Sequence, residues 1–337
     1  MKHVATLSNE ERDILFRNTA EKLSLTPAII EKDFWVCWTL DYLFHQSVWK
    51  HSLIFKGGTS LSKAYNLIRR FSEDIDLILD WRELGYDIGE PWLPRSNKKQ
   101  QEFNQMANAR AVSYLKDKML PVIQEDFSRL LGISADVSLD ARDGQTLLFR
   151  YPHLYSGNGI IQEIRLEIGP LAAATPASVC AIRPYAAEQY PSVFRQLETD
   201  VLTVLPERTF WEKVLILHSE AYRPDEIQVP PRYSRHYYDV MMIAESSVKE
   251  TAFADKELLK KVIEFKKKFY PLNRARYDLA LSGDIHLIPS PPHLETLKAD
   301  FEKMRVMIFD DVYSFDDIIG KLSQLEDEIR DGTNKMG

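Results

Sequence analysis

Hydrophobic and polar positions near the start of the chain predict two helices. The polar run SNEE at residues 8–11 is typical of a helix start and predicts a helix that ends near Leu23. Thr26 and Pro27 predict the next helix, with Thr26 as its N-cap and Pro27 at its first helical position. The sequence of this helix, AIIEKDFWVCWTLDYLFHQ, is so rich in large apolar residues that we expect most of it to be buried.

Short apolar runs in the middle of the chain predict the strands of a sheet. Residues 53–55 and 75–79 form two such runs, and residues 60–68 between them show a helical pattern. Residues 98–131 predict a longer helix, which Pro121 could break. Three more strands are predicted at residues 135–139, 146–151 and 160–168.

After Pro170 the pattern becomes mainly helical, with proline-rich breaks between the predicted helices. These helices occupy residues 206–223, 234–247, 254–270, 293–309 and 314–331. Together the patterns predict an α+β fold, in which residues 1–175 form a sheet core with flanking helices and residues 176–337 form a mainly helical region. They leave open whether that region is a separate domain or packs onto the sheet.

The composition is that of a globular protein and disfavours several classes of function. Hydrophobic residues make up 45% and charged residues 28% of the 337 residues. The net charge of −7 argues against a protein that coats nucleic acid, although it permits a local basic groove. Cys37 and Cys180 lack the spacing of a zinc site or a disulfide framework. No segment has the roughly 20 apolar residues of a membrane span, and the first residues do not form a signal peptide. We therefore expect no membrane contact and a cytoplasmic protein.

Candidate chemistry is concentrated in the stretch KGGTSLSKAYNLIRRFSEDIDLIL at residues 56–79. Asp74 and Asp76 are two residues apart in a predicted strand, so both side chains point to one face, with their α-carbons roughly 6–7 Å apart. Carboxylates at this spacing repel each other unless a cation lies between them, and Mg²⁺ binds carboxylates together with waters and phosphate oxygens. The alternative is an amphipathic strand with solvated aspartates, and these two residues alone favour that alternative.

The glycine pair before the predicted helix adds a candidate phosphate site. Gly57 and Gly58 lie between a strand and a helix that Thr59 and Ser60 open. Backbone amides at a helix N-terminus bind anions, glycine lets a phosphate approach closely, and Ser60 offers a hydroxyl donor. A simple tight turn is the alternative for the glycines alone. With the aspartates on the next strand, they describe one pocket that has phosphate donors on one wall and metal ligands on the other.

Glu167 is the candidate third metal ligand, since a two-metal site usually needs another carboxylate. It lies in the predicted strand IRLEIG, which ends at Pro170. If that strand is a neighbour of the aspartate strand, Glu167 completes the site. Glu163 has the same parity but lies nearer the strand start. A surface strand with alternating charges is an equally good reading of the local sequence.

The stretch FKGGTSLSKAYNLIRRFSEDIDLIL resembles the core of the AbiEii/AbiGii family of toxin nucleotidyltransferases, in the DNA polymerase β-like superfamily. The superfamily pattern is a Gly-Gly or Gly-Ser turn, a helix and D-x-D on the next strand, and the form GGTSL…RFSEDIDL is more specific. The resemblance is strong over residues 27–80 and weaker over residues 207–243. It implies a polymerase β-like sheet core. In one departure, the third acidic residue is Glu167, where the superfamily often has aspartate.

The resemblance also implies two functional residues in the second half. In PERTFWEKVLILHSEA it points to Lys213, which would contact the nucleotide triphosphate, and in SRHYYDVMMI to Asp239, which would lie close to Lys213. A lysine in an otherwise apolar helix agrees with a nearby anion, and its alternative is that the side chain extends to solvent. For Asp239 the alternative is a structural ion pair with Arg235 or Lys213.

These residues predict transfer of NMP from an NTP to an acceptor hydroxyl. Asp74, Asp76 and Glu167 are expected to hold two Mg²⁺ ions, and Gly57, Gly58, Thr59, Ser60 and Lys213 to bind the nucleotide, with Asp239 as a further catalytic residue. The resemblance implies that the acceptor is the tRNA 3′ end, and that the protein is the toxin of a type IV toxin–antitoxin and phage-defence pair, with a cognate antitoxin protein as partner. Two alternatives are an enzyme that attaches NMP to a protein and a non-catalytic interaction module.

Basic clusters with interleaved aromatic residues offer a surface for the acceptor RNA. The basic residues are Lys98, Lys99, Lys260, Lys261, Lys266, Lys267, Lys268, Arg274 and Arg276. Tyr270 and Tyr277 lie among them and could stack on bases. An ordinary solvated helix face is the alternative for KKVIEFKKKFY, and it is the more frequent one.

Overall fold

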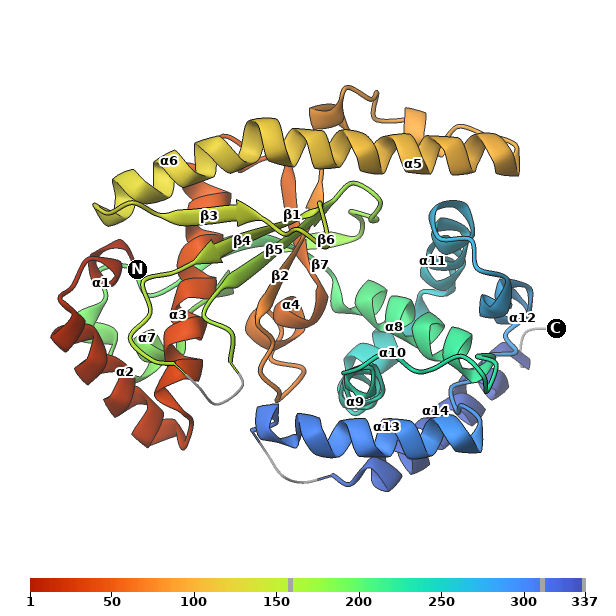
Figure 1. Ribbon diagram of the computed structural model, residues 1–337. Coiled ribbons are helices and arrows are strands. Elements are labelled where there is room, and N and C mark those ends of the chain that lie inside the picture. The colour runs from red at the N-terminus through yellow and green to blue at the C-terminus, as the bar shows by residue number, and fades with distance from the viewer. Residues whose placement is uncertain (157–159, 310–312, 335–337) are drawn as a thin grey trace. The chain divides into compact units, whose positions relative to one another are not determined.

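The computed structural model describes residues 1–156, 160–309 and 313–334, which form two compact units (Figure 1). The first unit consists of Met1–Tyr65 and Ser72–Val204 and contains the whole sheet. The second consists of Asn66–Phe71 and the chain from Leu205 on, and is helical. The predicted α+β fold, with a sheet core, flanking helices and a mainly helical second half, is confirmed.

The first unit is built on a mixed sheet of seven strands in the order β3-β4-β5-β2-β1-β7-β6. The strands are β1 (Leu53–Lys56), β2 (Asp74–Leu79), β3 (Asp136–Leu139), β4 (Thr146–Arg150), β5 (Ile164–Gly169), β6 (Ala177–Ile182) and β7 (Thr199–Val204). The central strand β2 runs antiparallel to β1 and parallel to β5. Ile75, Leu77 and Leu79 of β2 are buried, so the aspartates lie on the opposite face of the strand.

The helices of this unit are α1 (Lys2–Ala5), α2 (Asn9–Leu23), α3 (Pro27–Asp41), α4 (Gly57–Lys63), α5 (Asn97–Tyr114), α6 (Leu120–Leu131) and α7 (Tyr185–Gln189). Two of them, α2 and α3, begin where local sequence signals predict. Ser8 and Glu11 form a reciprocal capping box at the start of α2. The Thr26 side chain accepts a hydrogen bond from the Ile29 N–H at the start of α3, and Pro27 is the first helical residue.

An aromatic cluster joins α3, α6 and β4 on the apolar face of the sheet. The rings of Trp38 and Phe149 lie 4.8 and 4.6 Å from the ring of Phe127, measured between centroids. Burying a large apolar side chain contributes about 1.5–3 kcal/mol, so this cluster holds both helices on the sheet. The long segment α5–α6 (Figure 1) passes through a π-helical turn, Leu115–Met119, just before Pro121, which lacks the N–H of a regular helix.

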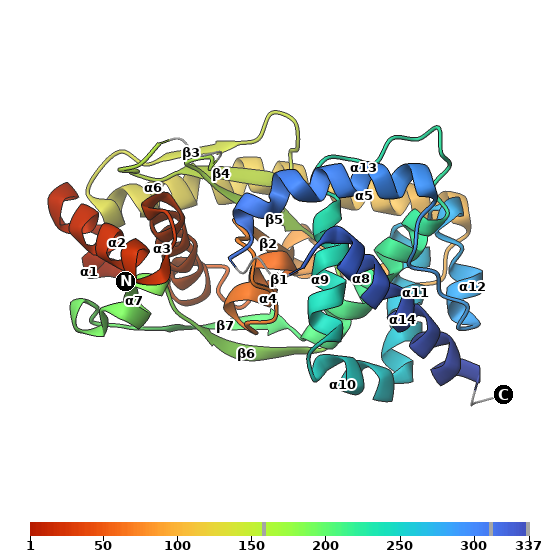
Figure 2. The same cartoon turned by 90° about the horizontal axis from the view of Figure 1, so that it is seen from below.

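The second unit is a bundle of helices around α8 (Figure 2). Its helices are α8 (Pro206–Ala221), α9 (Ser234–Ala244), α10 (Val248–Ala254), α11 (Lys256–Phe269), α12 (Tyr277–Leu281), α13 (Pro291–Met304) and α14 (Phe315–Asn334). The segment Asn66–Phe71 belongs here, because the Phe71 N–H donates to Met307 O and the Phe309 N–H donates to Arg69 O. No helix in the described part of the chain combines the length and apolar character that a membrane span requires.

The sheet unit extends to Val204, beyond the boundary expected near residue 175. The reason is that β6 and β7 pair with each other and β7 pairs with β1, which adds two strands to the sheet. The β-branched residues of TDVLTV at residues 199–204 are a strand signal that could have identified β7. By contrast, β6 is an edge strand in which only Ile182 is fully buried, so its apolar signal is weak.

The helix after β1 is also shorter and earlier than residues 60–68. It starts at Gly57 and ends at Lys63. Asn66 then takes a positive φ of 51°, which a helix cannot continue. The residues that follow pair within the second unit, and this competing set of contacts ends the helix.

Candidate active site

The central feature of the site is the register between β2 and β5. In this parallel pair, Asp76 is directly across from Glu167, and Asp74 is across from Arg165. Side chains of directly paired residues point to the same face of a sheet, so the three carboxylates and the guanidinium share one face. Glu163 precedes the first residue of β5 and is not in this register; its carboxylate lies 3.6 Å from Arg150 Nε and 3.8 Å from Arg165 Nη1. Of the two glutamates considered from the sequence, Glu167 therefore joins the aspartates.

The carboxylates on this face act on one another electrostatically. Burial, followed by repulsion from Asp76 and Asp74, raises the pKa of Glu167 to about 7, while Arg165 acts in the opposite direction. Near neutral pH, Glu167 is therefore divided between its protonated and ionised forms. A carboxyl group in this state can either bind a cation or accept a proton.

The fit of these residues to a divalent cation depends on Arg165. Its Nε lies 3.8 Å from Asp74 Oδ1 and 3.9 Å from Glu167 Oε1, and its Nη1 lies 2.9 Å from Asp140 Oδ2. Within the described ranges, no group of three or more His, Cys, Asp or Glu side chains is arranged to hold a metal ion. The donor chemistry nevertheless fits Mg²⁺, because these are hard oxygen ligands whose mutual repulsion adds to the effect of burial in raising the pKa of Glu167. A bound cation would take over the neutralising role that Arg165 has in this structure.

The glycine turn is in direct contact with the aspartate strand. Gly57 is the first residue of α4, has a φ of +81° and lies against the Asp76 carboxylate. The hydroxyl of Thr59 donates to the carbonyl oxygen of Asp74, and the hydroxyl of Ser60 donates to the carbonyl oxygen of Gly57 at 2.8 Å. The Thr59 hydroxyl therefore holds the turn against β2, and the Ser60 hydroxyl stabilises the turn itself.

Two buried ion pairs join α3 to this junction, and the sequence analysis did not identify them. Lys32 Nζ lies 2.6 Å from Glu73 Oε2, next to Asp74 in the chain, and Lys63 Nζ, at the end of α4, lies 2.7 Å from Asp33 Oδ1. All four side chains are less than one-tenth exposed. The available signal was the charged run EKD inside an otherwise apolar helix, because charges in such a place need partners.

Lys213 and Asp239 come together in the helical unit. Lys213 Nζ is 2.8 Å from Asp239 Oδ2, and Arg70 binds both oxygens of Asp239, with Nε–Oδ1 and Nη2–Oδ2 distances of 2.7 and 2.8 Å. Burial acts to raise the pKa of Asp239, but Arg70 and Lys213 outweigh it, so that pKa lies below its ordinary range. Burial also lowers the pKa of Lys213, and Asp239 opposes that shift. Arg70 was missed because its segment reads as the end of a helix.

The predicted residues thus fall into two groups. Gly57, Gly58, Thr59, Ser60, Asp74, Asp76 and Glu167 belong to the sheet unit, and Lys213 and Asp239 belong to the helical unit. The structure brings the members of each group together around one local feature. In the first group this feature is the α4–β2–β5 face, and in the second it is the buried pair with Arg70.

One family model matches most of this chain and agrees with this chemistry. A sequence model of the family described as nucleotidyl transferase AbiEii toxin, type IV toxin–antitoxin system, matches residues 40–321. Among solved structures, MenT4, a nucleotidyltransferase toxin from Mycobacterium tuberculosis H37Rv, is similar at 15% identity over 96% of this chain and 98% of that chain, with a TM-score of 0.42. A search of curated proteins found no match.

Proposed function

Because this chain belongs to the AbiEii family of nucleotidyltransferase toxins of type IV toxin–antitoxin systems, we propose that its reaction takes place at Asp74, Asp76 and Glu167. The register in which Asp76 pairs with Glu167 is the observation that carries this proposal. An NTP substrate and an antitoxin partner follow from the family. The alternative of a non-catalytic interaction module is set aside, because the family is one of nucleotidyltransferases.

Asp74, Asp76 and Glu167 are the residues that would hold Mg²⁺. When bound, the metal supplies Lewis-acid stabilisation of the charge that develops on the transferred phosphate. Glu167, with a pKa of about 7, is suited to accept the proton of the attacking hydroxyl. Asp76 keeps its orientation through its contact with Gly57. Each of these roles is a consequence of position on one sheet face.

The nucleotide phosphates would lie at the start of α4. The backbone amides of Gly57 and Gly58 are the proposed donors, since amides at such a turn point toward an anion. Thr59 and Ser60 contribute by holding the turn, because their hydroxyls already donate to Asp74 O and Gly57 O.

Lys213 would neutralise charge on the triphosphate, and Arg70 makes this role compatible with a stable fold. If Lys213 turns toward a phosphate, Asp239 still keeps both hydrogen bonds from Arg70. Asp239 is therefore proposed as a residue that positions Lys213, and its buried charge stays neutralised throughout.

The proposed acceptor is the 3′ end of tRNA, and a phage-defence role is proposed with it. The test is incubation of the full-length protein with total RNA and with protein, using each of the four NTPs labelled separately. We expect label in tRNA-sized RNA with Mg²⁺ present, and none with Asp76→Ala. Label found only in protein would replace tRNA by a protein acceptor, and transfer by Asp76→Ala at matched Mg²⁺ would overturn the assigned site.

A further inference from the structure

A cavity of about 380 Å³ in the helical unit combines aromatic rings with basic side chains. Its lining includes Tyr233 just before α9, Tyr270 just after α11 and Tyr277 at the start of α12. Lys266 and Arg274 line it as well. Flat rings beside cations are the combination that binds single-stranded nucleic acid, because bases stack on the rings and phosphates pair with the cations.

Two residues of the lining each carry a polar side-chain atom that has no hydrogen-bond partner among the described residues. Ser219 is 7% exposed, and its Oγ has no hydrogen-bond partner in the part of the chain that the structure describes. The same holds for Nε of Arg274. A buried donor or acceptor without a partner destabilises a fold by about 1–3 kcal/mol, so natural proteins rarely keep one without a role. The two residues that carry these atoms line the same cavity, where a change of side-chain rotamer would present the polar groups to a ligand.

The charge in the cavity is positive despite the presence of Glu220. Arg223 binds both oxygens of this carboxylate, and Arg274 Nη2 lies 3.5 Å from its Oε1. Lys266 Nζ lies 5.2 Å from the centre of the Tyr270 ring. With Glu220 neutralised by Arg223, Lys266 and Arg274 leave a net positive charge beside the tyrosine rings, which suits a phosphate.

One wall of the cavity is held in place by His218 of α8. Its Nδ1 accepts a hydrogen bond from the His286 N–H at 3.0 Å, and its Nε2 lies 3.2 Å from the carbonyl oxygen of Arg276, to which it donates. This assignment makes His218 neutral, with its proton on Nε2. The segment between Arg274 and Tyr277 is therefore tethered to the same helix that carries Ser219. Because this wall is already ordered before binding, less conformational entropy is lost when a ligand binds.

We propose that this cavity binds one nucleotide of a single-stranded RNA segment, with the base against the tyrosine rings and a phosphate at Lys266 and Arg274. Ser219 then contacts a polar edge of the base. The inference that the ligand is RNA rests on the proposed function, whereas the inference that it is a nucleotide rests on the residues that line the cavity. Because stacking and phosphate pairing do not read the base identity, binding is expected to tolerate different sequences.

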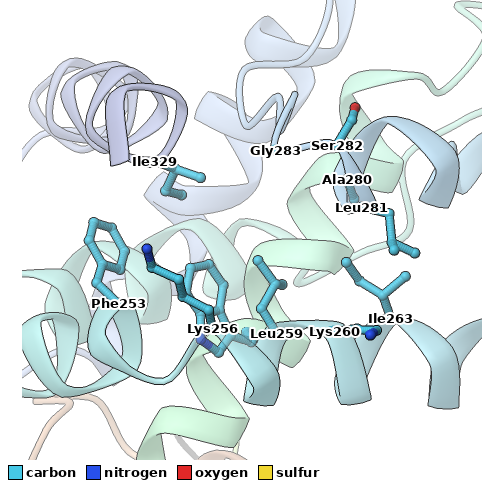
Figure 3. Close-up of a pocket in the computed structure, with 11 residues that line it drawn as sticks. Phe253, Lys256, Leu259, Lys260, Ile263, Ala280, Leu281, Ser282, Gly283 and Ile329 are labelled. Atoms are coloured by element: carbon cyan, nitrogen blue, oxygen red, sulfur yellow. The ribbon is translucent and has the colours of Figure 1, made fainter. Parts of the chain in front are cut away.

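A second cavity in the same unit offers a control. It has a volume of about 320 Å³, and its mainly apolar lining includes Trp211, Phe253 and Ile263 (Figure 3). Lys260 lines this cavity, whereas Lys266 on the same helix lines the tyrosine cavity. Replacing either lysine by alanine removes one charge from α11. The two variants therefore have the same effect on the charge of this helix and differ in the cavity that they affect.

The experiment measures binding of a fluorescently labelled single-stranded RNA oligonucleotide to the full-length protein without NTP, at fixed salt. Tyr270→Ala and Lys266→Ala should each weaken binding roughly tenfold, the size expected for one lost base contact, and Lys260→Ala less than twofold. Ser219→Ala should weaken binding while the thermal midpoint stays level or rises, because an unpartnered hydroxyl has been removed.

The following outcomes would overturn the assignment. Equal losses of RNA affinity for Lys260→Ala and Lys266→Ala indicate a general electrostatic effect. Wild-type affinity for both Tyr270→Ala and Ser219→Ala shows that the cavity holds no base. AMP that binds as tightly as the oligonucleotide shows a site for free nucleotide. The binding assay contains no NTP, so its result does not depend on transfer. RNA that binds in the cavity but accepts no label in the transfer assay therefore overturns the proposed acceptor and leaves the cavity assignment intact.

Discussion

Asp76 and Gly57 are in direct contact, because the Asp76 carboxylate occupies the space in which any other residue at position 57 would carry its β-carbon. An added β-carbon would lie 1.9 Å from Asp76 Oδ2 and 2.6 Å from its Cγ. Gly57 also has a φ of +81°, a region that residues with side chains rarely adopt. The glycine turn and the aspartate strand therefore form one junction, in which neither part can move without the other.

Gly57→Ala is expected to reduce nucleotidyl transfer about 100-fold or more, because a displacement of about 1 Å at a reacting group has an effect of this size. The added methyl group must push the Asp76 carboxylate away. Gly85→Ala is the matched control, since Gly85 has a similar φ of +78° but nothing within 4 Å of an added β-carbon. Steady-state transfer by the two purified variants checks this. Equal activities would show that the strain of a side chain at positive φ, and not the contact with Asp76, causes the loss.

Lys32→Met is expected to lower the free energy of unfolding by about 3–5 kcal/mol, since it leaves the buried Glu73 carboxylate without its cation. Its partner Glu73 is next to Asp74 in the chain, so transfer should fall as well. Adding Glu73→Leu should restore much of the stability. Arg183→Met is the control, because the Arg183–Glu198 pair is exposed and its loss should change stability by less than about 1 kcal/mol. Chemical denaturation followed by tryptophan fluorescence measures all four proteins.

Asp239→Asn and Lys213→Met should separate structural from catalytic roles in the helical unit. Asp239→Asn leaves the buried Arg70 and Lys213 without a counter-charge and should destabilise the protein by about 3–5 kcal/mol. Lys213→Met leaves the two Arg70 hydrogen bonds to Asp239 and should keep most of the stability, while transfer falls about 100-fold. Thermal unfolding and NTP turnover are measured for both. Near-normal turnover by Lys213→Met would make this lysine purely structural.

Glu31 should make stability depend on pH. Burial raises the pKa of this carboxyl to about 7, although the N–H groups of Leu154 and Tyr155 donate to it and Arg12 lies near. In the unfolded chain its pKa is near 4.5, so the folded state holds a proton over the range between these values. Its stabilising contribution is therefore complete below about pH 4.5 and is lost as the pH rises through about 7.

Glu31→Gln removes this titration. Relative to the wild type, the free energy of unfolding of this variant should increase by about 1–3 kcal/mol between pH 5 and pH 8, which is the order expected for a shift of this size. Thermal midpoints across this range check the prediction. Parallel profiles for the two proteins would mean that Glu31 is ionised in the folded state throughout.

Local signals were sufficient where the physics acts over a few residues. Ser8 and Thr26 were predicted as helix starts because a side chain near the first turn satisfies free amides there. The strand that carries Asp74 and Asp76 followed from a short apolar run, at the start of which the aspartates alternate with Ile75 and Leu77. The glycines before it were recognised as a turn, although the end of the following helix was not.

Partners from distant parts of the chain could not be derived in this way. Arg70 binds Asp239, 169 residues later, and Lys32 binds Glu73, 41 residues later. Nothing in the spacing of these residues predicts which charges will meet, because any buried charge could be paired by several others. The strand β6 was missed for a related reason, since its identity depends on pairing with β7 and not on its own pattern.

The sequence alone was enough to single out the candidate groups of the proposed site, since the aspartate pair, the glycine turn and the helices around them follow from short-range periodicity and steric limits. The choice between Glu163 and Glu167, the position of Arg165 among the carboxylates and the pairing of Asp239 with Arg70 depended on the folded chain. The physical reason is that strand register and ion pairing are set by packing between segments far apart in the sequence. Such packing is a property of the whole fold and leaves no trace in the local pattern.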